Sequence, residues 1–276
     1  FEDSRTFLIR DKFDFWQFDA QAPGTPKMYT ESYGRKNDTQ LSIIQLIEDP
    51  DKDASPMGRF GASIELKKNE PIYFTTFNRT TKESGLAIKD ITKGKAPVKK
   101  VVEGPYTYAD IKYAKAGKGK KAVFVFSRGN YEEGNNLFAS YDNFKTQKQL
   151  SDINPQQRDY NWGTVELVNW QTADDIFCEG LLFKPEDFDA NKKYPVMIYF
   201  YEKNASTLYR HRNPTPSRST INIPYFVSNG YVVFVPDVYF TEGHPGQSAM
   251  KSIMPGVEML EKTYPWIDGK NMAIQG

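Results

Sequence analysis

The sequence predicts a mixed fold: an all-β first half, residues 1–153, and a second half, residues 154–276, built on a doubly wound parallel sheet. Between residues 5 and 150, many short apolar runs are separated by clusters of Gly, Asn, Asp and Pro, and no helical period is present. A polar bridge, SDINPQQRDYN, follows. Beyond it, strand-like and helix-like segments alternate, which is the pattern of a doubly wound α/β sheet.

The first half has the pattern of antiparallel β-structure. Its strand candidates are rich in aromatic residues and short and regular in spacing, which favours propeller blades over the alternative, a β-sandwich. In chain order, the candidates are RTFLIRD, FDFWQFD, LSIIQLI, ASIEL, PIYFTTF, GLAIKDI, KAVFVFS and NLFASYD. We therefore expect the first half to form blades of a β-propeller.

The second half begins with two strand candidates, GTVELVNWQ and IFCEGLLFK. The apolar run YPVMIYFYE follows, and such a run is typical of a strand buried on both faces of a sheet. A weak helix is predicted over residues 223–229, because Gly230 suits the position just past a helix end. The run YVVFVPD is then predicted as another buried strand.

A second helix is predicted over residues 248–262. Pro255 lies inside it and should break or kink it, because an interior proline costs about 3 kcal/mol. Ser248 is expected to be the N-cap, since Ser is favoured there. The predicted buried face consists of residues at spacings of three and four, namely Met250, Ile253, Val257 and Leu260.

Composition excludes several classes of function. The chain has 36 basic and 35 acidic residues, so its net charge of +1 gives no reason to expect nucleic acid or an anionic membrane as a partner. No apolar run is long enough to span a membrane as a helix. One cysteine and two histidines cannot form a zinc cluster of thiolates and imidazoles, and no metal or cofactor is predicted. Cys178 is expected to be a small buried residue in a strand.

The last segment, MAIQG, is predicted as a short buried strand that ends at Gly276. In the motif G-x-S-x-G of α/β-hydrolases, the first glycine closes a strand and the serine lies on the turn that follows. The order of segments from residue 162 onward resembles the prolyl oligopeptidase family of serine peptidases, in its dipeptidyl-peptidase-like branch. The segments are GLLFKP, FDANKKYPVMIYFY, SNGYVVFVPD and WIDGKNMAIQG.

This resemblance implies propeller blades followed by the first part of an α/β-hydrolase sheet. It also implies an internal segment of a larger protein that ends just before the nucleophile, with Gly276 as the first glycine of the motif. Tyr201, at the end of the first parallel strand, matches the tyrosine whose hydroxyl donates to the tetrahedral intermediate in the family. The alternative is a tyrosine that caps a strand at a domain interface.

Two departures from the family pattern keep other functions open. A glycine pair is common after the first parallel strand, whereas this chain has Glu202, Lys203 and Asn204. The usual Asp-x-Arg-Gly is replaced by DVYF, which begins at Asp237. An esterase or deacylase of the same fold, or a non-catalytic binding scaffold, therefore remains an alternative to a peptidase.

The resemblance implies hydrolysis of short peptides by acyl transfer, with a peptide as substrate and no cofactor. It suggests a periplasmic or secreted location, and the oligomeric state is not indicated. Because a triad in the order Ser, Asp, His would follow Gly276, neither His211 nor His244 is expected to be the catalytic base. Residues 248–251 match the motif S-x-x-K, but the companion motifs S-D-N and K-T-G are missing.

Overall fold

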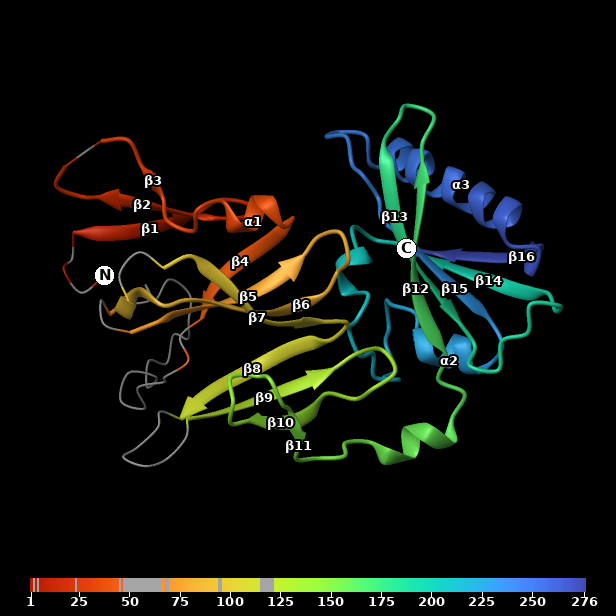
Figure 1. The fold of residues 1–276 in the computed structure, drawn as a ribbon. Coiled ribbons are helices and arrows are strands. Elements are labelled where there is room, and N and C mark those ends of the chain that lie inside the picture. The colour runs from red at the N-terminus through yellow and green to blue at the C-terminus, as the bar shows by residue number, and fades with distance from the viewer. Residues whose placement is uncertain are drawn as a thin grey trace. The chain divides into compact units, whose positions relative to one another are not determined.

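The computed structural model describes the chain except for residues 2, 4, 23, 45, 47–65, 68–69, 94–95 and 115–121. Two compact units are present (Figure 1). Unit 1 comprises Phe1–Gly129 and Asn135–Asp152, and unit 2 comprises Asn130–Gly134 and Ile153–Gly276. The predicted strand ASIEL lies outside the described residues, apart from Leu66.

The described residues of unit 1 form three antiparallel sheets. The first sheet consists of β1 (Thr6–Arg10), β2 (Phe15–Asp19) and β3 (Lys27–Met28), and the short helix α1 (Tyr33–Lys36) follows it. The second consists of β4 (Thr39–Ile44), β5 (Ile72–Asn78), β6 (Ser84–Lys89) and β7 (Val98–Gly104), with a 3-10 turn at Ile91–Lys93. The third consists of β8 (Thr107–Ala114), β9 (Val123–Gly129), β10 (Asn136–Ser140) and β11 (Lys148–Gln149).

The two four-stranded sheets of unit 1 connect their strands in chain order, which is the arrangement of propeller blades. Buried and less buried positions largely alternate along β5 and β9, as the period of two in a strand requires. Aromatic rings fill the core behind the third sheet. The centroid of the Phe144 ring lies 4.8 Å from that of the Phe124 ring and 4.7 Å from that of the Phe126 ring.

Unit 2 is built on one five-stranded sheet in the order β12-β13-β15-β14-β16. Its strands are β12 (Thr164–Gln171), β13 (Phe177–Lys184), β14 (Tyr194–Tyr199), β15 (Val232–Pro236) and β16 (Ile267–Gln275). Its helices are α2 (Ile223–Ser228) and α3 (Pro245–Thr263), with 3-10 turns at Pro155–Asp159 and Ala205–Thr207. The β12–β13 and β13–β15 pairs are antiparallel, whereas β15, β14 and β16 run parallel. The predicted order of strands and helices is confirmed.

Helices cover both faces of this sheet, as a doubly wound fold requires (Figure 1). On one face, Trp170 and Phe234 pack with Leu260 of α3. On the other, Phe183 packs with Val227 of α2. The central strand β15 is buried along its whole length, which explains its continuous apolar run. Cys178 is fully buried in β13, as predicted.

Helix α3 differs from the prediction at its start. It begins at Pro245, where the missing N–H of proline costs nothing in the first turn. Ser248 is therefore inside the helix, and the prediction that it is the N-cap is wrong. Its buried hydroxyl donates to the carbonyl of His244 (2.7 Å) and accepts from the backbone N–H of Thr241 (2.9 Å). Ser248 thus fixes the loop that enters the helix.

The buried face of α3 also differs from the prediction. Ile253, Val257 and Leu260 are buried, but Met250 is 60% exposed, so its predicted burial is wrong. The small residues Ser252 and Gly256 lie on the buried side instead. They leave room for the Trp170 indole, whose Nε1 donates to the Ser252 carbonyl (2.9 Å).

The helix continues through Pro255, so the predicted break does not occur. The last strand, β16, forms as predicted, but it is not buried as predicted. Ile274 is 62% exposed, because among the described residues β16 pairs with β14 alone and lies at the edge of the sheet.

The contact between α3 and the sheet predicts an unusual effect of one substitution. A Cβ on residue 256 would lie 2.9 Å from Cε2 of Trp170 and 3.1 Å from Cζ of Phe234. We expect Gly256→Ala to destabilise the protein by about 1–3 kcal/mol through overpacking, although alanine is the better helix former. Thermal and urea unfolding would measure this change.

Gly246→Ala is the matched control in the same helix. Nothing lies within 4 Å of a Cβ at residue 246, so we expect this change to be neutral or to stabilise by up to about 1 kcal/mol. If Gly256→Ala stabilised the protein as much as Gly246→Ala, the close contact with Trp170 would not limit the position of α3.

Candidate active site

The parallel strands of unit 2 end at a common edge of the sheet. The connection from β14 to β15 runs through α2 on one face of the sheet. The connection from β15 to β16 runs through α3 on the other face. In open α/β sheets, ligands bind outside the carboxyl ends of the strands at such a switch point. The residues that follow the three strands here include Tyr201, Asp237 and Gly276.

Gly276 lies directly beside the end of β14. Tyr199 is paired with Gln275, and the backbone N–H of Phe200 donates to the Gln275 carbonyl (3.1 Å). The Phe200 ring occupies the space next to residue 276, because a Cβ there would lie 2.7 Å from its Cζ. The end of β16 therefore requires glycine unless this ring moves.

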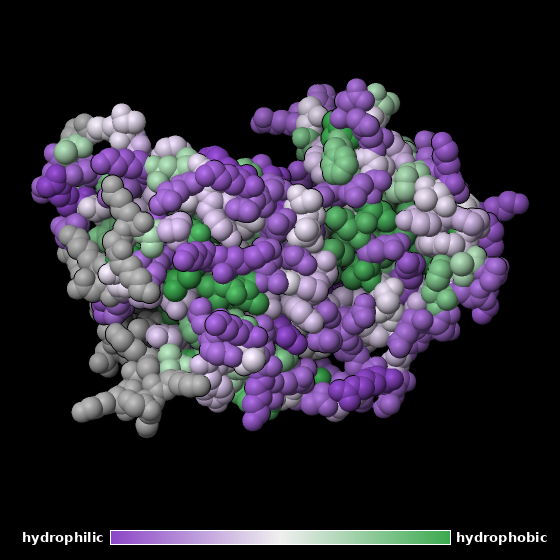
Figure 2. Space-filling view, viewed as in Figure 1, coloured by the Kyte–Doolittle hydropathy of each residue, from purple (hydrophilic) through white to green (hydrophobic). Residues whose placement is uncertain are grey.

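Tyr201 follows β14 by two residues, and its side chain is 71% exposed. Within the described residues, its hydroxyl makes no hydrogen bond. Phe240, four residues past the end of β15, is 50% exposed, and Ile274, near the end of β16, is 62% exposed. Figure 2, viewed as in Figure 1, shows that apolar residues of unit 2 reach the surface in patches among polar residues. The hydroxyl of Tyr201 is thus available to a ligand.

The loop that carries Tyr201 is held by the residues after β15. The carboxylate of Asp237 is 3% exposed and accepts hydrogen bonds from the backbone N–H groups of Asn204 and Ala205, the latter at 2.9 Å. The backbone N–H of Val238 donates to the carbonyl of Glu202 (3.0 Å). Burial raises the pKa of Asp237, and the two N–H donors oppose this rise.

Sequence reasoning treated Asp237 only as the start of an altered motif and missed its role in the loop. Asp237 directly follows a fully apolar strand, and because its carboxylate is buried there, it needs hydrogen-bond donors.

The two histidines lie away from any acidic partner in the part of the chain that the structure describes. The His211 ring stacks on Trp162 with centroids 5.3 Å apart, and its Nδ1 lies 3.3 Å from the carbonyl of Asn130. Burial lowers the pKa of His211. His244 is exposed and precedes α3. Neither histidine has the carboxylate that orients a catalytic base.

Among the described residues, no group of three His, Cys, Asp or Glu side chains could hold a metal ion. In the same residues, no helix combines the length and the apolar character needed to cross a membrane.

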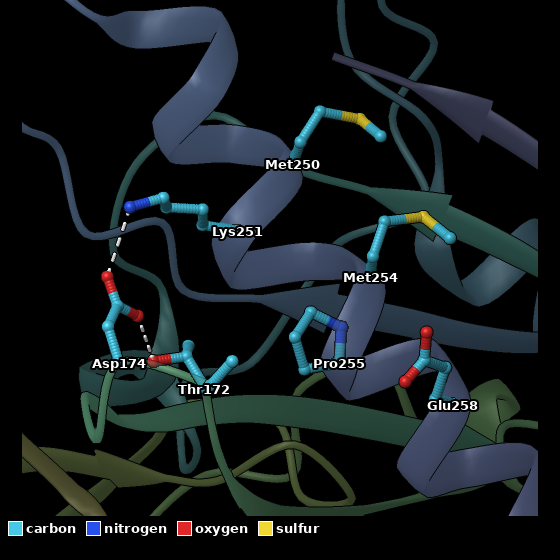
Figure 3. Close-up of a pocket in the computed structure, with 8 residues that line it drawn as sticks. Thr172, Asp174, Met250, Lys251, Met254, Pro255 and Glu258 are labelled. Atoms are coloured by element: carbon cyan, nitrogen blue, oxygen red, sulfur yellow. Dashed lines mark hydrogen bonds and ion pairs between the residues drawn. The ribbon is translucent and has the colours of Figure 1, made fainter.

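A separate groove of about 450 Å³ lies between α3 and the turn that joins β12 to β13 (Figure 3). Lys251 Nζ and Asp174 Oδ2 form an ion pair at 3.1 Å across it, and Thr172 Oγ1 donates to Asp174 Oδ1 (2.6 Å). The lining residues are Thr172, Ala173, Asp174, Met250, Lys251, Met254, Pro255 and Glu258. None of them follows a parallel strand, so this groove is distinct from the candidate active site.

No protein-family model and no curated protein matches the chain. Solved structures do. A protein described as a dipeptidyl aminopeptidase IV from Bacteroides ovatus has a TM-score of 0.61 and 15% identity, over 98% of this chain and 38% of that one. For Porphyromonas gingivalis dipeptidyl peptidase 4, the TM-score is 0.56 and the identity 13%, over 98% and 35%. For Pyrococcus horikoshii acylaminoacyl peptidase, the values are 0.52 and 14%, over 95% and 36%.

The chain therefore spans 35% to 38% of the length of these three proteins. At such low identity, the likeness concerns the fold. It confirms the fold class expected from the sequence. The chain has the fold of propeller blades followed by part of an α/β-hydrolase sheet.

Proposed function

We propose that this chain is a segment of a serine peptidase of the prolyl oligopeptidase type that hydrolyses short peptides by acyl transfer. The observation that carries the proposal is the arrangement of Tyr201 and Gly276 at adjacent carboxyl ends of parallel strands, at the switch point of the sheet. The fold is shared with three proteins that are described as peptidases.

In this proposal, Gly276 closes β16 as the first glycine of G-x-S-x-G, and the serine follows two residues later in the complete protein. The serine attacks the scissile carbonyl, and a histidine outside residues 1–276 accepts its proton. The hydroxyl of Tyr201 donates to the oxyanion that forms. Such a donor typically lowers the barrier by about 2.7–4 kcal/mol.

The role of Tyr201 can be tested in the full-length protein. We expect Tyr201→Phe to lower kcat about 10²–10³-fold with little change in KM, because the hydrogen bond would form only in the transition state. Tyr225→Phe, at a tyrosine of α2 that is 61% exposed, is the matched control and should leave kcat unchanged. A Tyr201→Phe variant with full kcat on both a peptide amide and an aryl ester would remove Tyr201 from the mechanism.

Asp237 is expected to act as a positioning residue for the Tyr201 loop. Asp237→Ala leaves the N–H groups of Asn204 and Ala205 without an acceptor, so it should cost about 1–3 kcal/mol for each buried donor left unsatisfied and also lower kcat. Asp237→Asn keeps an acceptor oxygen and removes a buried charge, so stability and kcat should both be retained. Thermal unfolding and steady-state kinetics would check this pair, and equal losses in both variants would contradict it.

The location of the nucleophile can be mapped directly. After reaction of the full-length protein with a fluorophosphonate, mass spectrometry should find the label on the serine two residues beyond Gly276. The serines within residues 1–276 should carry none, and this chain by itself should form no acyl-enzyme. Label on Ser248, the serine of the S-x-x-K match, would contradict the proposal.

A further inference from the structure

The loop between β14 and α2 is rich in positive charge and borders the candidate active site. Both ends of the loop are hydrogen-bonded to Gln275. The backbone carbonyl of Gln275 accepts from the backbone N–H of Phe200 (3.1 Å), and the side-chain Nε2 of Gln275 donates to the carbonyl of Ser219 (3.3 Å). Between these ties, the loop has one carboxylate, Glu202. Its cationic side chains are Lys203, Arg210, Arg212 and Arg218.

Arg212 is the cation of this loop that the structure holds in place. Its Nη2 donates to Thr207 Oγ1 (2.8 Å), and its guanidinium carbon lies 5.4 Å from the centroid of the Phe183 ring. Thr207 belongs to the 3-10 turn that follows the N–H groups bound by Asp237. The side chain of Arg212 is thus packed and only partly exposed.

The guanidinium of Arg212 is not satisfied by this packing. Within the described residues, no carboxylate pairs with it, its Nη1 makes no hydrogen bond, and its buried Nε has no partner. An arginine remains charged in proteins, and a partly buried charge without a counter-charge is costly.

The surroundings of Arg212 disfavour its positive charge. Burial and the nearby charge of Arg210 lower the pKa of Arg212, whereas Tyr131 and Tyr199 raise it. Arg212 is linked through Thr207 to the turn at Ala205–Thr207, and the backbone N–H of Ala205 in this turn donates to Asp237, directly after β15.

We propose that Arg212 binds a carboxylate of the substrate, so that the site selects acidic peptides. The inference rests on the proposed peptidase function and specifies its substrate class. The planar guanidinium group matches the geometry of a carboxylate, because it can donate two parallel hydrogen bonds to the two carboxylate oxygens. An acidic side chain and a free C-terminal carboxylate share this chemistry, and a test must separate them.

The test uses the full-length protein and three peptides of one sequence. One peptide contains Glu, one contains Gln at the same position, and one contains Gln with an amidated C-terminus. We expect the Glu peptide to be bound and hydrolysed at least about tenfold better than the Gln peptide. A tenfold difference between the free and the amidated C-terminus would instead assign the carboxylate to the peptide end, which also supports the subsite.

Variants connect this preference to Arg212. Arg212→Gln should bring the Glu-to-Gln ratio of kcat/KM close to one, and Arg212→Lys should keep part of it. Arg210→Gln removes the same charge from an exposed side chain two residues away, and it should retain most of the preference for the Glu peptide. If Arg212→Gln does not fold, the ratios of the unchanged protein and competition by glutarate decide the question.

Binding measured by calorimetry separates the two proposals. Preferential binding of the carboxylate peptide without hydrolysis of any peptide would overturn the peptidase function alone. If the Glu-to-Gln ratio and the ratio between the free and the amidated C-terminus were both one, in binding and in hydrolysis, the carboxylate subsite would be overturned. The peptidase function would remain in place. The same ratio loss in Arg210→Gln and Arg212→Gln would show a general effect of charge and would also overturn the subsite.

Discussion

The burial of β15 is the constraint on which unit 2 depends. The residues Val232–Pro236 are buried on both faces, so helices must cover both sides of the sheet, and the neighbouring strands must be held in register. The same burial places Asp237, the next residue, inside the protein. A buried carboxylate needs hydrogen-bond donors, and the loop after β14 supplies two of them. The geometry of the candidate site is therefore a consequence of core packing.

The candidate site differs from the surrounding structure in the polar groups that it leaves available. Elsewhere in unit 2, polar side chains are used inside the fold: Ser248 bridges two backbone groups, and Trp170 bonds to the Ser252 carbonyl. In the loop after β14, the Tyr201 hydroxyl and part of the Arg212 guanidinium have no partner among the described residues. The Arg212 guanidinium, which contacts Thr207 and Phe183, is held in place and is suited to binding a ligand.

Small residues decide how closely elements approach in this unit. Gly256 lets α3 lie against the indole of Trp170, and Gly276 lets the end of β16 lie against the ring of Phe200. In both places, an aromatic ring fills the space that a Cβ would need. The helix and the strand end are thus positioned by shape, and the exposed Met250 contributes little to the position of α3.

The sequence by itself determined the order of strands and helices in unit 2, the change from an all-β to an α/β pattern and the burial of Cys178, but it missed the strands β7 and β8 of unit 1. These features follow from local periodicity and residue type, which act over a few neighbours. Only the tertiary structure decided that Ser248 lies inside α3, that Met250 faces outward and that β16 is exposed at an edge. It also revealed the tether at Asp237 and an Arg212 that pairs with no carboxylate among the described residues. These features depend on contacts between residues far apart in the chain, and no local pattern specifies such contacts.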